Sequence, residues 1–137
     1  FTLLDGGISD SIPLKFFNGV GYDHNIVILT QPRDYTKKQY HDKKLRILKG
    51  ALKKYPAVYE KLANRYQAYN EELEEVWQQE KEGKILVIRP RENLNIGSLS
   101  HDIDKKKRVY EAGRQAGMEN LMKMKLFYNI EEDFDKQ

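Results

Sequence analysis

The stretch NIVILTQP, residues 25–32, is a continuous run of mostly apolar and β-branched residues that ends at a proline. Runs of this length and content are typical of a strand that is buried on both faces of a sheet. A second such run, KILVIRP, occupies residues 84–90. Because helical sequence separates the two runs, they favour an α/β sheet over an antiparallel sandwich. We therefore expect doubly buried strands near residues 26–30 and 85–89.

Helical patterns surround these two strands. PLKFFNG, residues 13–19, begins with proline and stops at glycine, which is the usual order for a short helix. Residues 42–54 place leucines on one helical face, and the clearest helix spans roughly residues 56–82. Residues 99–128 are also predicted to be helical, in two segments that Gly117 separates.

In the clearest helix, apolar and aromatic residues recur at alternating spacings of three and four, which is the pattern of a buried seam. The seam consists of Tyr59, Leu62, Tyr66, Tyr69, Leu73 and Val76. It covers about two and a half heptads, which is short for a free coiled coil. We expect these side chains to be core residues, and a surface for ligands or acyl chains is the alternative that residue types leave open.

The chain has 137 residues, which suits one domain whose core needs no disulfide or metal. It contains no cysteine, which excludes disulfides, cysteine nucleophiles and thiolate metal sites and fits a reducing compartment. No apolar run reaches the length of a membrane span. We therefore expect a cytoplasmic protein, and peripheral attachment to a membrane stays open.

The formal net charge of +3 hides a segregated pattern. Residues 33–54 contain nine Lys or Arg against two Asp, whereas residues 71–82 contain six Glu. A basic block of this kind can bind anionic lipid or nucleic acid. It is more often the solvated face of a helix, which is the interpretation that we favour.

The chain begins FTLLDGGISDSIPL, in which residues 1–4 are predicted to end a strand and Asp5-Gly6-Gly7 is a strong break signal. Because the first residue is not a methionine and the chain opens within a predicted strand, we expect a fragment of a longer protein. Asp5 has two interpretations. It is either a turn residue that bonds its own backbone, or a catalytic acid at the carboxyl end of a strand, where open α/β sheets place their ligands.

Other patterns for catalysis or metal binding are incomplete. The three histidines, His24, His41 and His101, are far apart and have no metal-ligand companion at helical spacing. No HExxH, phosphate-loop or GxGxxG motif occurs. The serine elbow G-x-S-x-G begins at Gly7 and fails at Ser11. We therefore expect no metal, no cofactor and no nucleophile in this chain.

A series of stretches resembles one known family. DGGISDSIPL at residues 5–14 resembles the second conserved block of the patatin-like phospholipases, in particular the bacterial members. GYDHNIVILTQPRDY at 21–35 resembles the strand that follows that block. NRYQAYNEELEEVWQQEKEGKILVIRP at 64–90 resembles the family's Tyr-Asn helix and the I-R-P strand after it. LNIGSLSHD at 94–102, with the helix after it, resembles the family's end, so the resemblance covers essentially the whole chain.

The resemblance implies a serine acyl hydrolase that uses a Ser–Asp dyad. Asp5 matches the dyad aspartate, and Gly6 and Gly7 match the rest of its motif. The implied role of Asp5 is to accept the serine proton as a general base and later to activate water. In that family the serine elbow and the oxyanion loop lie upstream. Residues 1–137 would therefore be a single C-terminal portion of a patatin-like domain, with a partial sheet and the N-terminal half of the fold missing.

This resemblance predicts that the chain alone is inactive, and that lipids or other acyl esters are the substrates of the full-length parent. An incomplete sheet exposes an apolar edge. We therefore expect a homo-oligomer, or association with the missing N-terminal half. The alternative function is a non-catalytic α/β module that binds lipid or nucleic acid through the basic residues 33–54, and nucleic acid is not the favoured ligand.

Overall fold

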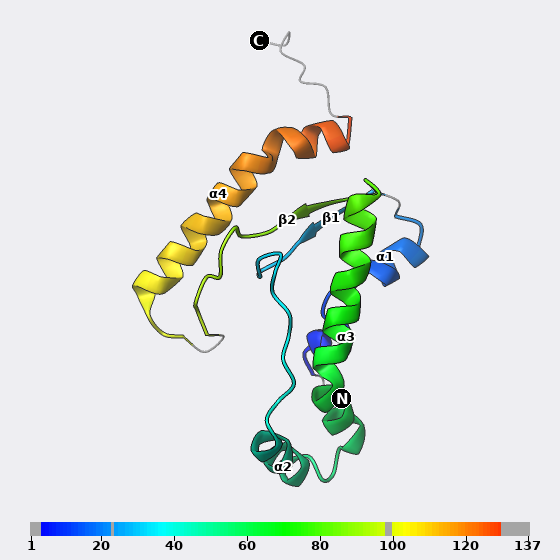
Figure 1. Ribbon diagram of the computed structural model, residues 1–137, viewed down its shortest axis with the longest axis vertical. Helices are drawn as coiled ribbons and strands as arrows, with labels where there is room; N and C mark the ends of the chain where they lie inside the picture. The colour runs from blue at the N-terminus through cyan, green and yellow to red at the C-terminus, as the bar shows by residue number, and fades with distance from the viewer. Residues whose placement is uncertain (1–3, 23, 98–99, 130–137) are drawn as a thin grey trace. The chain divides into compact units, whose positions relative to one another are not determined.

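A computed structural model describes residues 4–22, 24–97 and 100–129 of the chain (Figure 1). The described residues form a mixed α/β fold that is mostly helical and has one small parallel sheet of two strands, and the α/β class agrees with the sequence prediction. In chain order, the elements are the short 3-10 helix η1 (Gly6–Ile8), α1 (Leu14–Gly19), β1 (Asn25–Ile28), α2 (Asp42–Ala51), α3 (Pro56–Lys81), β2 (Ile85–Ile88) and α4 (Ile103–Phe127).

The chain divides into two compact units, each built from two separate stretches. Unit 1 contains residues 1–21 and 36–78, and unit 2 contains residues 22–35 and 79–137. Unit 1 therefore holds η1, α1, α2 and most of α3. Unit 2 holds the sheet and α4.

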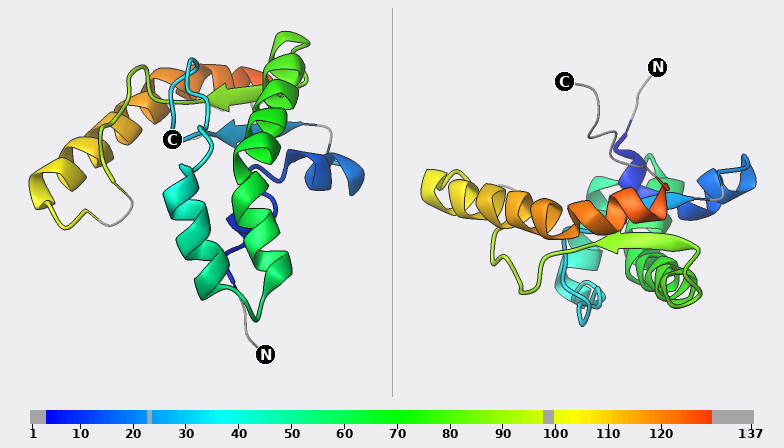
Figure 2. Two further views of the ribbon diagram at one scale, coloured as in Figure 1. Left: turned by 60° about the horizontal axis from the view of Figure 1, so that its bottom comes forward. Right: turned by 90° about the horizontal axis from the view of Figure 1, so that it is seen from above.

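The sheet of unit 2 pairs β1 with β2 in parallel, and Figure 2 shows the two arrows pointing the same way. The register places Asn25 opposite Ile85 and Ile28 opposite Ile88. Both strands lie where the sequence predicted them, and their parallel pairing confirms the α/β prediction. Three of the four β2 residues are buried. The expectation that β1 is also buried on both faces is wrong, because the Ile28 residue is 74% exposed.

The turn between α3 and β2 depends on Gly83. The backbone N–H of Gly83 donates to the carbonyl of Glu80 (3.1 Å), and that of Lys84 donates to the carbonyl of Gln79 (3.0 Å). This pair of bonds closes the helix end in a Schellman motif, in which the residue after the cap is left-handed. Gly83 has φ +71°, a conformation that glycine adopts without steric cost. The chain can therefore leave α3 and enter β2 within three residues.

Helix α4 begins at a side-chain cap. The Asp102 carboxylate accepts a hydrogen bond from the backbone N–H of Lys105 at 3.0 Å, and Asp104 adds a second acid in the first turn. The prediction of a break at Gly117 is wrong, because α4 is continuous from Ile103 to Phe127. Glycine inside a helix costs only about 1 kcal/mol relative to alanine, which neighbouring helical residues can offset.

In unit 1, local sequence signals explain where the helices start and stop. Proline occupies the first position of α3, where its missing N–H is not needed. Helix α2 has Asp42 in its first turn and Lys49 in its last, which complements the helix dipole. It ends at Ala51, somewhat before the predicted boundary at residue 54.

The predicted seam of α3 is buried most deeply in its C-terminal half. Tyr69, Leu73 and Val76 are buried, and the seam residues of the N-terminal half are half-buried. Among the described residues of unit 1, Ile12 and Leu14 are the other buried apolar residues. The seam therefore forms core, as predicted.

The predicted first strand is not part of the described sheet. Residues 1–3 lie outside the described part of the chain, and Leu4 is exposed and is not in a strand. The expected position of Asp5 at a strand end therefore stays a prediction.

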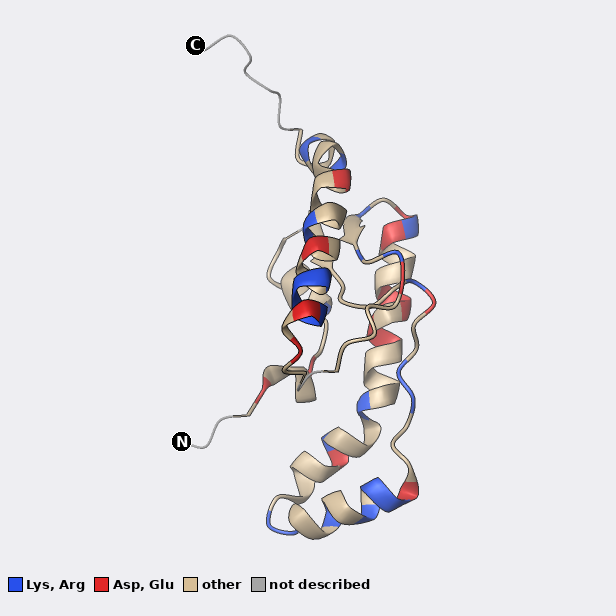
Figure 3. Cartoon of the chain, turned by 90° about the vertical axis from the view of Figure 1, so that its left-hand side faces the viewer, with Lys and Arg blue, Asp and Glu red and all other residues tan. Residues whose placement is uncertain are grey.

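Charge is distributed along the helices much as the sequence indicated. Lys and Arg cluster on α2, and Glu residues cluster in the second half of α3 (Figure 3). The Leu45 and Leu48 side chains of α2 are half-buried, whereas its Lys and Arg residues are exposed. Across the described residues, no helix combines the length and the apolar content that crossing a membrane requires.

We predict that Leu73→Ala lowers the free energy of unfolding by about 2–5 kcal/mol, because truncation leaves a cavity in the core of unit 1. Leu73 is only 4% exposed. The matched control is Ile47→Ala on α2, because Ile47 is 64% exposed. That control should change the free energy by less than about 0.5 kcal/mol. Urea denaturation followed by circular dichroism measures both, and equal losses would contradict the burial pattern.

Candidate functional site

Asp5 lies at the start of a tight turn on the surface of unit 1. Its Oδ1 atom accepts a hydrogen bond from the backbone N–H of Gly7 at 2.8 Å, and its carbonyl accepts one from Ile8 at 3.1 Å. Among the described residues, no other donor is bonded to the Asp5 carboxylate. Asp5 therefore makes the local turn bond that one of the two sequence interpretations required. Its exposed carboxylate also keeps the capacity to accept a further hydrogen bond.

The two glycines after Asp5 differ in how tightly they are enclosed. A Cβ atom built at Gly7 would lie 3.2 Å from Asp5 Oδ1 and 3.4 Å from Nη2 of Arg65. A Cβ atom at Gly6 would meet nothing within 4 Å. The absence of a side chain at Gly7 therefore lets the Asp5 carboxylate and the Arg65 guanidinium both approach this turn.

Glu72 of α3 holds the segment that follows the turn. Its two carboxylate oxygens accept hydrogen bonds from the backbone N–H of Ser11 (3.3 Å to Oε1) and from that of Ile12 (2.9 Å to Oε2). The Ser11 hydroxyl donates in turn to the carbonyl of Gly7 at 2.8 Å. A chain of contacts therefore joins α3 to the turn that carries Asp5.

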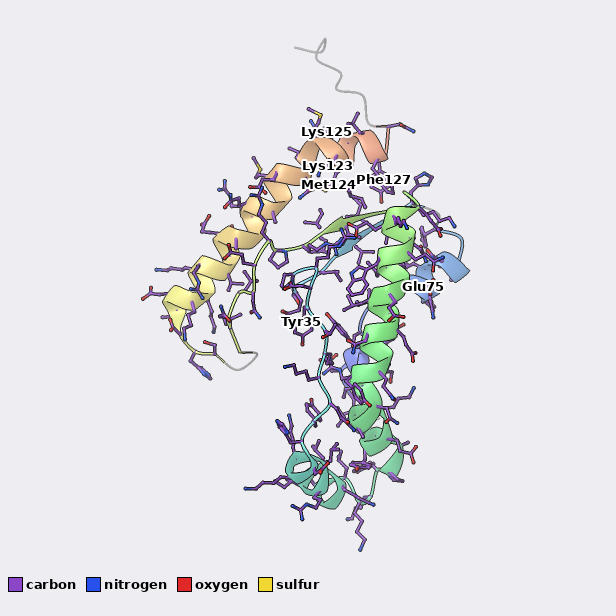
Figure 4. The ribbon with its side chains drawn as sticks, in the orientation of Figure 1. Tyr35, Glu75, Lys123, Met124, Lys125 and Phe127 are labelled. Carbon is purple, nitrogen blue, oxygen red and sulfur yellow. The ribbon has the colours of Figure 1, made fainter. Side chains whose placement is uncertain are left out.

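A second side chain of α3 binds the other arm of unit 1. The Asn70 side chain accepts a bond from the Lys37 N–H (2.8 Å) and donates to the Lys37 carbonyl (3.1 Å). The Lys37 ammonium lies 4.2 Å from the centre of the Tyr69 ring. Farther along the helix, Glu75 forms an ion pair with Lys15 of α1 (3.3 Å; Figure 4 labels Glu75). Helix α3 is therefore the scaffold to which both outer segments are attached.

The charges around Glu72 perturb one another. Burial raises the pKa of the Glu72 carboxyl above its ordinary value of 4.5, although the bonds from Ser11 and Ile12 oppose that shift. Burial also lowers the pKa of Lys37, and the neighbouring Arg65 guanidinium lowers it further. Arg65 itself has a buried Nε atom with no hydrogen-bond partner in the described part of the chain. This combination of partly buried, mutually interacting charges is typical of functional sites as well as of structural networks.

Arg65, Asn70 and Glu72 were not predicted as site residues from the sequence. A signal was available, because Arg65, Tyr69, Glu72 and Val76 follow one another at spacings of four, three and four. Such spacing places polar residues on the same stripe as core residues. Charged groups beside a buried seam need partners, and those partners come from segments that are distant in sequence.

The other residues considered in the sequence do not assemble into a site. Within the described residues, no group of His, Asp or Glu could hold a metal ion. The His24 ring of unit 2 lies 5.5 Å from the Phe127 ring, which is an aromatic contact. The prediction of a nucleophile upstream of this chain is not tested by these contacts.

We predict that Glu72→Gln lowers the free energy of unfolding by about 1–3 kcal/mol, because an amide has one acceptor oxygen for two partly buried N–H donors. The matched control, Glu74→Gln, changes an exposed residue of the same helix and should have an effect below about 0.5 kcal/mol. Urea denaturation of the two variants measures the difference.

The raised pKa of Glu72 also predicts that the destabilisation caused by Glu72→Gln depends on pH. Because the Glu72 pKa is raised in the folded protein, its stabilising contribution is full below the ordinary value of 4.5 and is lost as the pH rises through the folded value. Glutamine does not titrate. The difference in stability between the native protein and Glu72→Gln should therefore shrink as the pH rises above the ordinary value of 4.5. A difference that grows with pH would contradict the raised pKa.

Comparison with known proteins gives a family but no activity. A family model described as "Domain of unknown function (DUF6363)" matches residues 55–129, which include α3, β2 and α4. No curated protein and no solved structure matches the chain. The matched region contains Arg65, Asn70 and Glu72, whereas Asp5 precedes it. Because the match covers more than half of the 137 residues, the chain belongs to the family described as Domain of unknown function (DUF6363).

Proposed function

We propose that this chain is the C-terminal part of a patatin-like serine acyl hydrolase, in which Asp5 is the dyad aspartate. The proposal rests on the ordered series of stretches that resemble that family, which begins with Asp5-Gly6-Gly7. One structural observation carries it furthest. The Asp5 carboxylate is exposed, and its turn is linked through Ser11 to Glu72 on α3.

In the proposed reaction, the serine oxygen of the upstream half attacks the carbonyl carbon of an ester. The Asp5 carboxylate accepts the serine proton and then passes it to the oxygen of the leaving alcohol. Water then attacks the acyl-enzyme as Asp5 accepts one of its protons. Asp5 passes that proton to the serine oxygen as the acyl–serine bond breaks, so the carboxylic acid is released and the serine is restored. No metal or organic cofactor takes part in these steps.

The parent protein would take a phospholipid or another acyl ester as its substrate. We place the parent protein in the cytoplasm, because a chain without cysteine has no disulfide that would require an oxidising compartment. The upstream half would extend the two-stranded sheet, and an isolated sheet of two strands is marginally stable at best. Without that half, a homo-oligomer could cover the same surface.

The decisive experiment expresses the complete reading frame that contains this chain, with p-nitrophenyl butyrate as substrate. We expect an in-frame G-x-S-x-G upstream of Phe1, and ester hydrolysis by the complete protein. Asp5→Asn should lower kcat by about 100- to 10,000-fold, which is the usual range for loss of a general base. The control Asp10→Asn should stay within about threefold, because Asp10 has no proposed role in the reaction.

The 137-residue chain alone should not hydrolyse the ester. The proposal would be overturned if the complete reading frame lacked the serine motif. Full activity of the Asp5→Asn protein would also overturn it. In either case the matched family region would need another function.

The second candidate is a non-catalytic module that binds an anionic membrane surface. One observation favours it: the Lys and Arg residues between residues 42 and 54 are all exposed. These residues are Lys43, Lys44, Arg46, Lys49, Lys53 and Lys54. Binding of the chain to phosphatidylserine vesicles should then fall steeply with salt, because exposed charges are screened. Binding that is absent, or that does not depend on salt, would exclude this function.

A further inference from the structure

Unit 2 contains an open groove between the segment after β2 and one face of α4. After β2, residues 89–95 run beside α4 in the opposite direction to the helix (Figure 1). Two contacts hold the segment there: Arg91 Nη2 lies 2.9 Å from Glu119 Oε2, and Arg108 Nη2 donates to the carbonyl of Leu94 at 3.1 Å. The groove has a volume of about 600 Å³, which lies within the usual range for sites that bind small molecules.

The lining of this groove contains more basic than acidic side chains. It includes the four cations Arg89, Arg91, Arg108 and Lys123, against two carboxylates. Its formal charge is therefore +2. The amides of Asn93 and three other residues add donors and acceptors. A ligand that fits this lining should be anionic and should carry further polar groups.

The helical side of the groove comes from one face of α4. Lining residues occur at positions 108, 112, 115, 116, 119, 120 and 123, which follow helical spacing. Ala112 and Ala116 lie in the middle of this face, where their small side chains leave room. Arg108 and Lys123 lie toward its two ends, and Figure 4 labels Lys123 on the C-terminal half of α4. Positive charge therefore flanks an open central space.

Arg89 is the most enclosed cation of the groove. Its side chain is only 13% exposed and forms an ion pair with Glu80 through Nη2. Its Nη1 atom is buried and has no hydrogen-bond acceptor among the described residues. Because this atom is buried, a ligand in the open groove would not contact it, and Arg89 contributes its charge to the lining instead.

We propose that this groove binds the phosphate group of a small phosphorylated polyol, either free in solution or as the headgroup of a lipid. Guanidinium groups match the geometry of phosphate oxygens, and a lysine ammonium adds a point charge. Because Arg89 and Arg91 are ion-paired with Glu80 and Glu119, the positive charge that faces a ligand comes mainly from Arg108 and Lys123. The groove is larger than a phosphate ion, and its amide side chains suit the hydroxyl groups of a polyol. This site lies within the matched family region and is independent of Asp5.

The first test is calorimetric titration of the whole chain with glycerol 3-phosphate, with inorganic phosphate, and with glycerol as the uncharged control. We expect saturable binding of glycerol 3-phosphate, weaker binding of phosphate and none of glycerol. Binding should weaken as the pH falls through about 6, because the dianionic phosphate group then takes up a proton and becomes a monoanion. Vesicles of phosphatidylcholine, with and without phosphatidate, test the lipid source in parallel.

The variant Lys123→Gln should weaken binding about tenfold or more, as expected for the loss of a charged contact. Its control is Lys107→Gln, because Lys107 is an exposed residue of α4 that does not line the groove. This control should change the affinity less than about twofold, and Lys123→Arg should retain most of it. Thermal unfolding of each variant confirms that it is folded.

The outcomes separate the two sources of phosphate. Binding of glycerol 3-phosphate that Lys123→Gln weakens supports a soluble ligand. Binding of phosphatidate vesicles alone, weakened by the same variant, supports a lipid headgroup. Equal loss in Lys107→Gln and Lys123→Gln would reveal general charge attraction and would overturn the proposal. Absence of binding to every phosphate-bearing probe would overturn it too.

Discussion

In unit 1, the position of the N-terminal segment depends on the Glu72 carboxylate, which accepts hydrogen bonds from two backbone N–H groups. Those groups belong to Ser11 and Ile12, some sixty positions earlier in the chain. Hydrogen bonds to an ionised acceptor are stronger than neutral ones. Burial raises the pKa of Glu72, and the bonds from Ser11 and Ile12 oppose that shift. The contact acts as a positional constraint that fixes the segment containing Asp5 against α3. The buried core beside it, which includes Ile12 and Leu73, contributes to the stability of this arrangement.

Much of the local structure could be predicted from the sequence, because its causes are local. The α3 helix begins at a proline and carries a seam of regular spacing, and both boundaries matched closely. The two strands were recognised from their β-branched runs, and their parallel pairing followed from the helical sequence between them. The caps at Asp102 and Gly83 are likewise set by single residues.

What the sequence could not predict depends on contacts between distant segments. The strand β1 has an apolar composition, yet nothing in that composition reveals that Ile28 is 74% exposed. Gly117 looks like a break, and only the continuous helix around it shows otherwise. Glu72 and Asn70 resemble ordinary polar helix residues until Ser11, Ile12 and Lys37 are brought against them. The groove of unit 2 likewise forms only because the segment after β2, residues 89–95, lies along α4.

The two interpretations of Asp5 are compatible in chemical terms. The turn bond uses Oδ1, and a carboxylate has a second oxygen that can accept a proton from an incoming hydroxyl. The bond from Gly7 restricts rotation of the carboxylate, and Gly7 can approach so closely because it has no side chain. Ser11 binds the carbonyl of the same glycine, and Glu72 holds the backbone of Ser11. An aspartate oriented through such a series of contacts suits a general base, because a proton acceptor is effective only when its direction is fixed. Under the proposed function, the turn bond would position the carboxylate and would leave its second oxygen available for the serine proton.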